Sequence, residues 1–545
     1  MTVLNLINES WLPVRRLSGQ REWIAPWALT EAHDSDPIVA LDAPRPDFQG
    51  ALAQFLIGLL QTAAAPDAGG EIDWSKWLES PPSPQRLEEL FRPYTDHFEL
   101  GGEGPRFMQD LDKLDGEPKP IASLLIEIPG ANTLRNNTDH FIKRGGVEHI
   151  CPACAATALF TLQSSAPSGG AGHRTSLRGG GPLTTLVVLD PKGEELTASL
   201  WRDLWLNVLP ESIIDGLTGN PDLRDPAAIF PWLAPTRISG KGGEDTFPQH
   251  VHPLQMYWGM PRRIRLDLDD PVAGECDICS TASESLLGGY MTKNYGINYN
   301  GAWEHPLTPH YIDANSGMPM PSHAQPGGFS YRHWSGWVTP GETRKPARVV
   351  SYFQEQRRFD NAQLRLWASG YDMDNMKARA WYETTVPLYL LPDGEGRQRF
   401  IRQVDNLIDA ATQAAYYAQS AVKEAWFSRP GDAGGDTTFI RQEFMARTEE
   451  VFYTLLRQSH EAALHGGEET PLRELWLQHL RREAERLFEE RAESGALDEG
   501  ELARIARAHI NLRKRLMGNK LYELLGLAKP SKGKTEKQEE TANAD

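Results

Sequence analysis

The distribution of apolar residues divides the chain into two regions of different character. Up to about residue 392, strand-like runs such as "LTTLVVLD" (183–190) and "RRIRLDL" (262–268) occur among loops rich in Gly, Pro, Trp and Asn. "WLPVRRLSGQREWIAP" (11–26) predicts a hairpin that turns at its Ser-Gly pair. The apolar run "ALAQFLIGLLQTAAA" (51–65) predicts a buried helix. We therefore expect a mixed α/β region with long loops, and loops often carry function.

A turn-rich joint near Pro392 separates this region from one with helical periodicity. Four amphipathic segments follow, at Gln398–Ser428, Thr438–His465, Pro471–Ser494 and Asp498–Leu527. Gly, Pro and capping residues separate them, and short connections between long helices favour an antiparallel bundle. The sequence thus predicts an α+β protein, with a mixed α/β domain over 1–392 and an antiparallel four-helix bundle over 393–527. The tail over 528–545 has too few apolar residues to fold.

The charge of the chain argues against a general affinity for nucleic acid. The formal net charge is −18, from 56 basic and 74 acidic residues, whereas phosphate contacts need clustered Lys and Arg. The window 132–181 is locally basic, with Arg135, Lys143, Arg144, Arg174 and Arg178 against Asp139 and Glu148. No apolar run is long enough to span a bilayer, and the first residues lack the basic region of a signal peptide. We expect a cytoplasmic protein without a membrane partner.

The chain has 4 cysteines, and all of them occur in two Cys-x-x-Cys pairs. Four thiolates are the ligand set of a closed tetrahedral zinc site. Disulfides are disfavoured in a cytoplasmic protein, and a thioredoxin-like redox motif would need one pair rather than two. We therefore expect Cys151, Cys154, Cys276 and Cys279 to bind one structural Zn²⁺.

The sequence offers no set of catalytic residues. "HEAALH" (460–465) places its histidines at i and i+5, whereas a zinc-protease helix needs i and i+4. The acidic run Asp267–Asp270 is more typical of a solvated strand than of a metal site. A phosphate-binding loop and a nucleophile elbow are both missing from the sequence. We therefore expect the protein not to be an enzyme.

The segment "APSGGAGHRTSLRGGGPLTTLV" (166–187) is rich in glycine and follows the first cysteine pair. Glycine lets the backbone approach a ligand closely, and Arg174 and Arg178 lie nearby in the sequence. Such a loop could cradle phosphate or lie against a DNA groove. A flexible loop without a ligand has the same composition, so composition alone leaves both interpretations open.

Taken in order, several motifs resemble one known family. They are "NLINESWLPVR", "NNTDHFIKRG", "CPACAATALFTLQSSAPSGGAGHRTSLRGG", "GECDICS", "YGINYNGAWEHPLTP" and "SGYDMDNMKARAWYE". The chain resembles the CasA family, the large subunit of the type I-E CRISPR Cascade surveillance complex. The resemblance spans nearly the whole chain, and the shared order of the motifs is its specific part.

The resemblance implies a non-enzymatic recognition subunit with a mixed α/β domain and a C-terminal four-helix bundle. Such a subunit reads the protospacer-adjacent motif in double-stranded DNA and promotes strand separation and R-loop formation. It also recruits the helicase–nuclease. The implied partners are the other Cascade subunits, the crRNA 5′ handle, target DNA and the helicase–nuclease.

The resemblance also assigns residues. A loop that enters the minor groove corresponds to Ser168, Gly169, Gly170, Ala171 and Gly172, with Arg174 beside it. A lysine position corresponds to Lys293, or to Asn294 if the alignment is anchored on Trp303. A wedge hairpin places Asp374 and Asn375 at its tip, next to Lys377. A loop near the crRNA handle and DNA supplies Asn137, His140, Phe141, Lys143 and Arg144.

Two positions depart from the family pattern: Ala171 interrupts the glycine run, and the wedge tip carries Asp-Asn where a glutamine can occur. Two other functions stay open. A stand-alone zinc-containing nuclease would cut DNA as a purified chain with added metal. In a purely structural scaffold, mutation of the glycine loop and wedge would leave DNA binding unchanged.

Overall fold

The computed structural model describes residues 4–67, 71–128, 145–170, 172–191, 199–356, 364–374, 376–432, 435–494 and 502–530. Internal packing divides the chain into two units. The first comprises Met1–Phe329 and Gly336–Leu390, and the second comprises Ser330–Ser335 and Leu391–Asp545.

The strands of the first unit form small antiparallel sheets rather than one large sheet. Three-stranded sheets have the orders β2-β1-β3, β11-β10-β12, β14-β13-β5 and β4-β9-β6, and β7 pairs with β8. The strands are β1 (Leu12–Arg16), β2 (Arg21–Ile24), β3 (Ile38–Leu41), β4 (Lys119–Pro120), β5 (Thr184–Leu189), β6 (Arg263–Leu266), β7 (Val272–Glu275), β8 (Ala282–Leu286), β9 (Gly289–Lys293), β10 (His310–Ile312), β11 (Pro319–Pro321), β12 (Arg344–Lys345), β13 (Leu364–Asp374) and β14 (Lys377–Pro387). The strands predicted within 183–190 and 262–268 are confirmed as β5 and β6.

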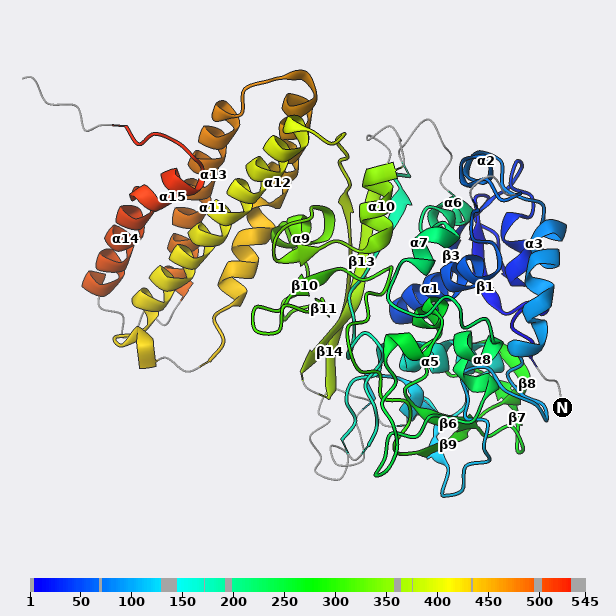
Figure 1. The fold of residues 1–545 in the computed structure, drawn as a ribbon. Coiled ribbons are helices and arrows are strands. Elements are labelled where there is room, and N and C mark those ends of the chain that lie inside the picture. The colour runs from blue at the N-terminus through cyan, green and yellow to red at the C-terminus, as the bar shows by residue number, and fades with distance from the viewer. Residues whose placement is uncertain are drawn as a thin grey trace, which may run out of the picture. The chain divides into compact units, whose positions relative to one another are not determined.

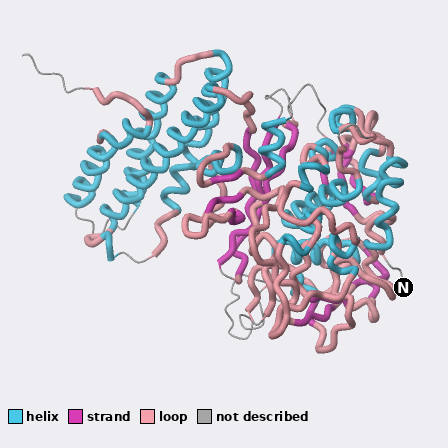
Figure 2. Tube along the Cα trace, viewed as in Figure 1, coloured by secondary structure: helices cyan, strands magenta, loops and turns pink. Residues whose placement is uncertain are grey.

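Short helices and long loops fill the rest of the first unit, and Figure 2 shows how much of it is loop. The α-helices are α1 (Pro46–Ala63), α2 (Trp74–Glu79), α3 (Pro84–Phe91), α5 (Pro152–Ser165), α6 (Leu200–Trp205), α7 (Glu211–Asp215), α8 (Pro226–Ile229), α9 (Trp334–Val338), which crosses into the second unit, and α10 (Arg348–Gln356). The predicted mixed α/β character is confirmed.

Helix α1 runs through the core of the first unit. Pro46 begins it, because proline has a φ suited to the first helical turn. The Phe55 ring is 1% exposed and packs edge to face, at centroid distances of 5.2–6.0 Å, against Trp11, Phe98, Phe107, Phe160 and Trp258. The buried helix predicted at 51–65 is confirmed, and so is the hairpin between β1 and β2, where Gly19 has φ +90°.

Strands β13 and β14 form a long hairpin that rests on the start of α1 (Figure 1). The Tyr371 hydroxyl donates a 2.5 Å hydrogen bond to Asp47 Oδ2, and Asp47 is 3% exposed. The Trp381 ring lies so close to Gly50 that a Cβ there would stand 2.9 Å from it. These contacts hold the hairpin against the helix in the half that is nearer its tip.

The second unit contains the C-terminal helices: α11 (Glu395–Trp426), α12 (Phe439–His465), α13 (Thr470–Ser494), α14 (Leu502–Leu516) and α15 (Asn519–Leu524), drawn from yellow to red in Figure 1. Helix α11 contacts each of the other four. Its fully buried alanines let neighbouring helices approach closely; they are Ala410, Ala411, Ala414, Ala415, Ala418 and Ala421. The single helix predicted at Asp498–Leu527 is wrong, because the chain breaks at Gly518 into α14 and α15. Within the described residues, no helix combines the length and apolarity needed to cross a membrane.

The second unit also includes Ser330–Ser335, a segment from the middle of the chain. Tyr331 is 0% exposed and stacks on Phe452 with ring centroids 4.2 Å apart. Its hydroxyl lies 2.7 Å from Thr448 Oγ1, and Trp334 is also 0% exposed. This short segment therefore supplies two large side chains to the core of the helical unit, which the sequence analysis does not predict.

Candidate metal centre and nucleic-acid interface

The four cysteines come together in the first unit. The Sγ atoms of Cys151, Cys154, Cys276 and Cys279 all lie within 4.8 Å of one another, and those of Cys151 and Cys279 are 3.7 Å apart. Zinc–sulfur bonds of about 2.3 Å in tetrahedral geometry place the sulfurs about 3.8 Å apart. The two Cys-x-x-Cys motifs thus form one cluster that can hold a metal ion, as predicted from their spacing.

The start of α5 shapes the first half of this cluster. Cys151 is the N-cap of α5, and its Sγ accepts a 3.5 Å hydrogen bond from the Cys154 amide. The Cys151 amide donates to Cys276 Sγ at 3.2 Å. The thiols hydrogen-bond to one another, which lowers the pKa of Cys279 to about 6 and raises the pKa of Cys154. Helix N-termini and N–H donors both favour thiolate, so the cluster suits a divalent cation.

The second half of the cluster is the turn between β7 and β8. Ser280 has φ +57°, and its amide donates to the Cys276 carbonyl at 2.9 Å. The Asp277 carboxylate accepts hydrogen bonds of 2.7 Å from the amides of His149 and Glu148, which lower the pKa of Asp277. These bonds join the turn to the segment before Cys151, so protein contacts already align the two cysteine pairs.

The loop that follows α5 is a tight turn. Ser168, Gly169 and Gly170 are exposed. The Gly169 amide donates to the His173 carbonyl at 3.1 Å, and the His173 amide donates to the Gly170 carbonyl at 2.8 Å. Gly170 and Gly172 have φ values of +68° and +88°, in the left-handed region that favours glycine. Hydrogen bonds between Gly169, Gly170 and His173 therefore fix the described part of this turn.

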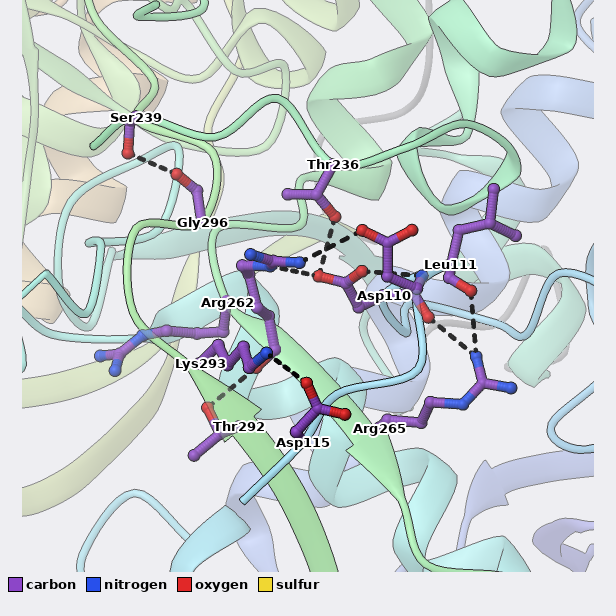
Figure 3. Close-up of polar contacts among 12 residues, drawn as sticks. Asp110, Leu111, Asp115, Thr236, Ser239, Arg262, Arg265, Thr292, Lys293 and Gly296 are labelled. Atoms are coloured by element: carbon purple, nitrogen blue, oxygen red, sulfur yellow. Dashed lines mark hydrogen bonds and ion pairs between the residues drawn. The ribbon is translucent and has the colours of Figure 1, made fainter. Parts of the chain in front are cut away.

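The segment after β9 lies against this loop. The Tyr295 amide donates to the Gly172 carbonyl at 2.7 Å. Asn294 is exposed, and its Cβ is 3.1 Å from where a Cβ on Gly172 would stand. Lys293 Nζ lies 3.3 Å from Asp115 Oδ2, as Figure 3 shows. Asn294 is thus held against the glycine loop, whereas Lys293 forms an exposed ion pair.

Tyr295 is a residue that the sequence analysis misses. It has φ +63° and is 45% exposed. A Cβ on Gly172 or on Gly240 would stand 2.8 or 3.2 Å from the Tyr295 ring. The Arg174 guanidinium lies 5.9 Å from the centre of that ring and donates to Ser239 Oγ and O at 2.7 and 2.6 Å. Arg174 therefore supports Tyr295 from within the protein. A left-handed tyrosine has no sequence signal that would have predicted it.

The tip of the β13–β14 hairpin also lies beside the glycine loop. Asp374 pairs with Lys377 at the end of the ladder. Met376, in the turn, is 55% exposed, and its Sδ is 3.9 Å from where a Cβ on Gly170 would stand. The glycine loop, the segment after β9 and the hairpin tip therefore form one exposed surface. We call it the convergent surface and define it by Gly169, Gly170, Asn294, Tyr295 and Met376.

Arg178 is not part of the convergent surface and lies in the core of the first unit. It is 3% exposed and donates to Gln54 Oε1 at 2.6 Å and to Thr184 Oγ1 and Thr308 Oγ1 at 3.1 and 3.2 Å. Burial lowers the pKa of Arg178 to about 9. The expectation that Arg178 lies near a ligand of the glycine loop is wrong, because its guanidinium is fixed in the core.

Several candidate residues lie outside the residues that the structure describes. They are Ala171 of the glycine loop, Asn375 of the hairpin tip, and Asn137, His140, Phe141, Lys143 and Arg144. Their assignment stays a prediction.

Comparison with known proteins identifies the class as CRISPR-associated. A family described as "CRISPR-associated protein Cse1" matches residues 5–487, so the chain belongs to the Cse1 family. The fold is similar to that of Cse1 from Acidimicrobium ferrooxidans, with TM-score 0.67, 16% identity and coverage of 97% of this chain and 100% of that one. CasA (Cse1) from Thermus thermophilus gives TM-score 0.63 and 18% identity over 96% of this chain and 100% of that one. A chain of a structure named "CRISPR RNA-guided surveillance complex" has TM-score 0.64 and 15% identity, with coverage of 95% of this chain and 100% of that one.

Proposed function

We propose that this protein is the non-catalytic large subunit of a type I-E Cascade complex. In this role it reads the protospacer-adjacent motif in double-stranded DNA, promotes strand separation and R-loop formation, and recruits the helicase–nuclease. The observation that carries the proposal is the convergent surface, where three segments far apart in the sequence meet around exposed glycine backbone. Membership of the Cse1 family supports it, and one structurally similar chain comes from a CRISPR RNA-guided surveillance complex.

The chemistry of the convergent surface suits degenerate readout of a short motif. The minor groove offers few distinguishing groups, so a narrow backbone-rich loop can accept several related motifs. Guide RNA pairing then supplies the remaining specificity. In this role Gly169 and Gly170 lie in the groove, and the hairpin tip, with Asp374 and Asn375, stands beside the first target base pair.

The remaining roles follow from the charge and from the cysteine cluster. A chain of net charge −18 needs neighbouring subunits to supply most phosphate contacts. The segment with Asn137, His140, Phe141, Lys143 and Arg144 contacts the crRNA 5′ handle and DNA. The cysteine cluster binds Zn²⁺ as a structural ion, because four thiol ligands leave no open coordination position.

Gly170 gives the sharpest test of the proposal. Among the described residues, a Cβ there meets Met376 Sδ alone, at 3.9 Å, whereas a Cβ at Gly169 or Gly172 clashes within the protein. Asn and Asp both tolerate the left-handed backbone and are nearly isosteric. In the assembled complex, we expect Gly170→Asp to weaken binding of a motif-containing duplex by about tenfold more than Gly170→Asn. The reason is that only Asp brings negative charge toward the phosphates.

Electrophoretic mobility shift with duplex and single-stranded targets measures this difference. Both variants should assemble normally and bind a complementary single strand like the wild type, because no motif is read there. Equal effects of Asp and Asn on duplex binding, or equal losses on duplex and single strand, would contradict the proposed role of the loop.

A further inference from the structure

Three arginines in "RRIR" (262–265) have different surroundings. Arg263 forms ion pairs with Asp110 and Asp112, and Arg265 donates to the carbonyls of Asp110 and Leu111 at 3.0 and 3.4 Å. Side chains alternate along a strand, and Figure 3 shows Arg262 pointing away from these acidic partners. Arg263 is therefore paired with carboxylates, Arg265 donates to carbonyls on the same side of the strand, and Arg262 points to the other side.

Arg262 lies directly behind the glycine loop. Its Nη2 donates to the Pro167 carbonyl at 2.5 Å, and its Nη1 lies 2.8 Å from where a Cβ on Gly169 would stand. Its backbone amide and carbonyl both bond to the Gln163 side chain, at 2.9 Å each. The guanidinium is thus fixed in place and holds the start of the loop.

The charge of Arg262 has no counterion within the described part of the chain. Its Nε is buried without a hydrogen-bond partner, and burial lowers the pKa of Arg262 to about 10. The neighbouring His173 offers no negative charge either: burial lowers its pKa, and the positive charges of Arg262 and Lys119 lower it further. An arginine that is largely desolvated and not neutralised is costly, whereas its planar fork matches a phosphate.

We propose that Arg262 is a phosphate-binding residue of the protospacer-adjacent-motif site. Nη2 of its guanidinium holds the Pro167 carbonyl, and Nη1, which lies beside the exposed Gly169, takes a non-bridging oxygen of a DNA phosphate next to the motif. The same residue therefore shapes the glycine loop and attaches it to the DNA backbone. This inference rests on the proposed function and adds a residue that motif resemblance does not assign.

The test compares Arg262→Gln with Arg265→Gln in the assembled, crRNA-loaded complex. Gln at 262 carries no charge and is too short to reach the Pro167 carbonyl, so the salt dependence is what separates a lost phosphate contact from a lost loop contact. Arg265→Gln removes one charge from the opposite side of the same strand and serves as the matched control. Duplex affinity is measured at several salt concentrations, with assembly and single-stranded target binding as controls for folding.

We expect Arg262→Gln to weaken duplex binding by about tenfold to a hundredfold. Its log–log salt slope should be shallower by about one, as for the loss of one phosphate contact. Arg265→Gln should leave the slope unchanged. Weaker binding with an unchanged slope, or equal slopes for the two variants, would overturn the inference. If the proposed function itself is wrong, Gly170→Asp and Gly170→Asn also bind duplex alike. A wrong role for Arg262 alone leaves the difference between those two Gly170 variants in place.

Discussion

At the scale of single residues, the glycines of the loop have different reasons to be glycine. A Cβ on Gly169 would stand 2.5 Å from His173 Cβ, and one on Gly172 would stand 2.8 Å from the Tyr295 ring. These two positions are therefore restricted by the protein itself, whether or not DNA is bound. At Gly170 no described residue would clash with a Cβ, so within the protein its requirement is the left-handed backbone.

This difference leads to a prediction for Gly172→Ala. Strain at φ +88° and the clash with Tyr295 should together lower the free energy of unfolding by about 2–4 kcal/mol. The double variant Gly172→Ala, Tyr295→Ala should recover the part due to the clash but not the backbone strain. A double-mutant cycle of thermal unfolding measures that coupling. Strictly additive effects would mean that the tyrosine ring does not restrict Gly172.

At the scale of elements, the β13–β14 hairpin is anchored to the rest of the first unit close to its tip. Tyr371 and Trp381 fasten it to α1, and a register shift between Asp372 and Met373 lies just before the tip. Such irregularities increase the local twist and re-aim the strand. Anchoring so close to the tip restricts its position, which suits the proposed role beside a base pair.

From the proposed role of the hairpin tip, we predict how fast R-loops form when the tip is changed. Opening a base step costs a few kcal/mol. Each 1.4 kcal/mol of this cost that the tip offsets raises the rate of opening by a factor of ten. Asp374→Ala with Asn375→Ala should therefore slow R-loop formation on a closed duplex by at least about tenfold. It should matter little on a target already melted next to the motif. Stopped-flow fluorescence on both targets makes the comparison, with the exposed Thr385→Ala at the hairpin base as control.

Equal impairment of the tip variant on closed and melted targets would instead indicate a general folding or binding defect. Normal rates on both would mean that the tip does not assist opening. Thr385→Ala should match the wild type in each case.

The sequence predicts local features of this fold better than long-range ones. The buried helix at 51–65, the β1–β2 hairpin and the cysteine pairing follow from periodicity, turn chemistry and spacing. The left-handed Tyr295 and the position of Arg262 behind Gly169 depend on tertiary contacts that no local pattern encodes. Even Arg178, which sequence places beside the glycine loop, lies in the core because three neutral acceptors surround it there.

At the scale of the whole molecule, the cysteine cluster closes a long stretch of chain between Cys154 and Cys276. The glycine loop and Arg262 both lie in that stretch. An ion bound by all four thiols would therefore restrict the segment that carries the glycine-loop part of the convergent surface. Closure of a loop of this length is worth about 4–5 kcal/mol in the chain-entropy treatment.

Elemental analysis of the purified protein should accordingly give about one zinc per chain. Cys276→Ser should lose the ion and lower the free energy of unfolding by several kcal/mol, seen as a lower melting temperature. Ser283→Ala, in the neighbouring strand β8, keeps all four thiols and is the control. If the metal-free wild-type protein is fully folded and melts at the same temperature as the metal-bound protein, the ion has no structural role.

The segment Ser330–Ser335 has a consequence for how the protein can be divided. Because it belongs to the helical unit, the chain passes between the units after Phe329, after Ser335 and after Leu390. A cut at the joint near 393–396 would break only the last of these passages, and Tyr331 would stay stacked on Phe452. The two fragments would behave as a complementing pair rather than as two free domains. A helical fragment expressed alone would lack part of its own core, and a supplied peptide covering 330–335 would complete it.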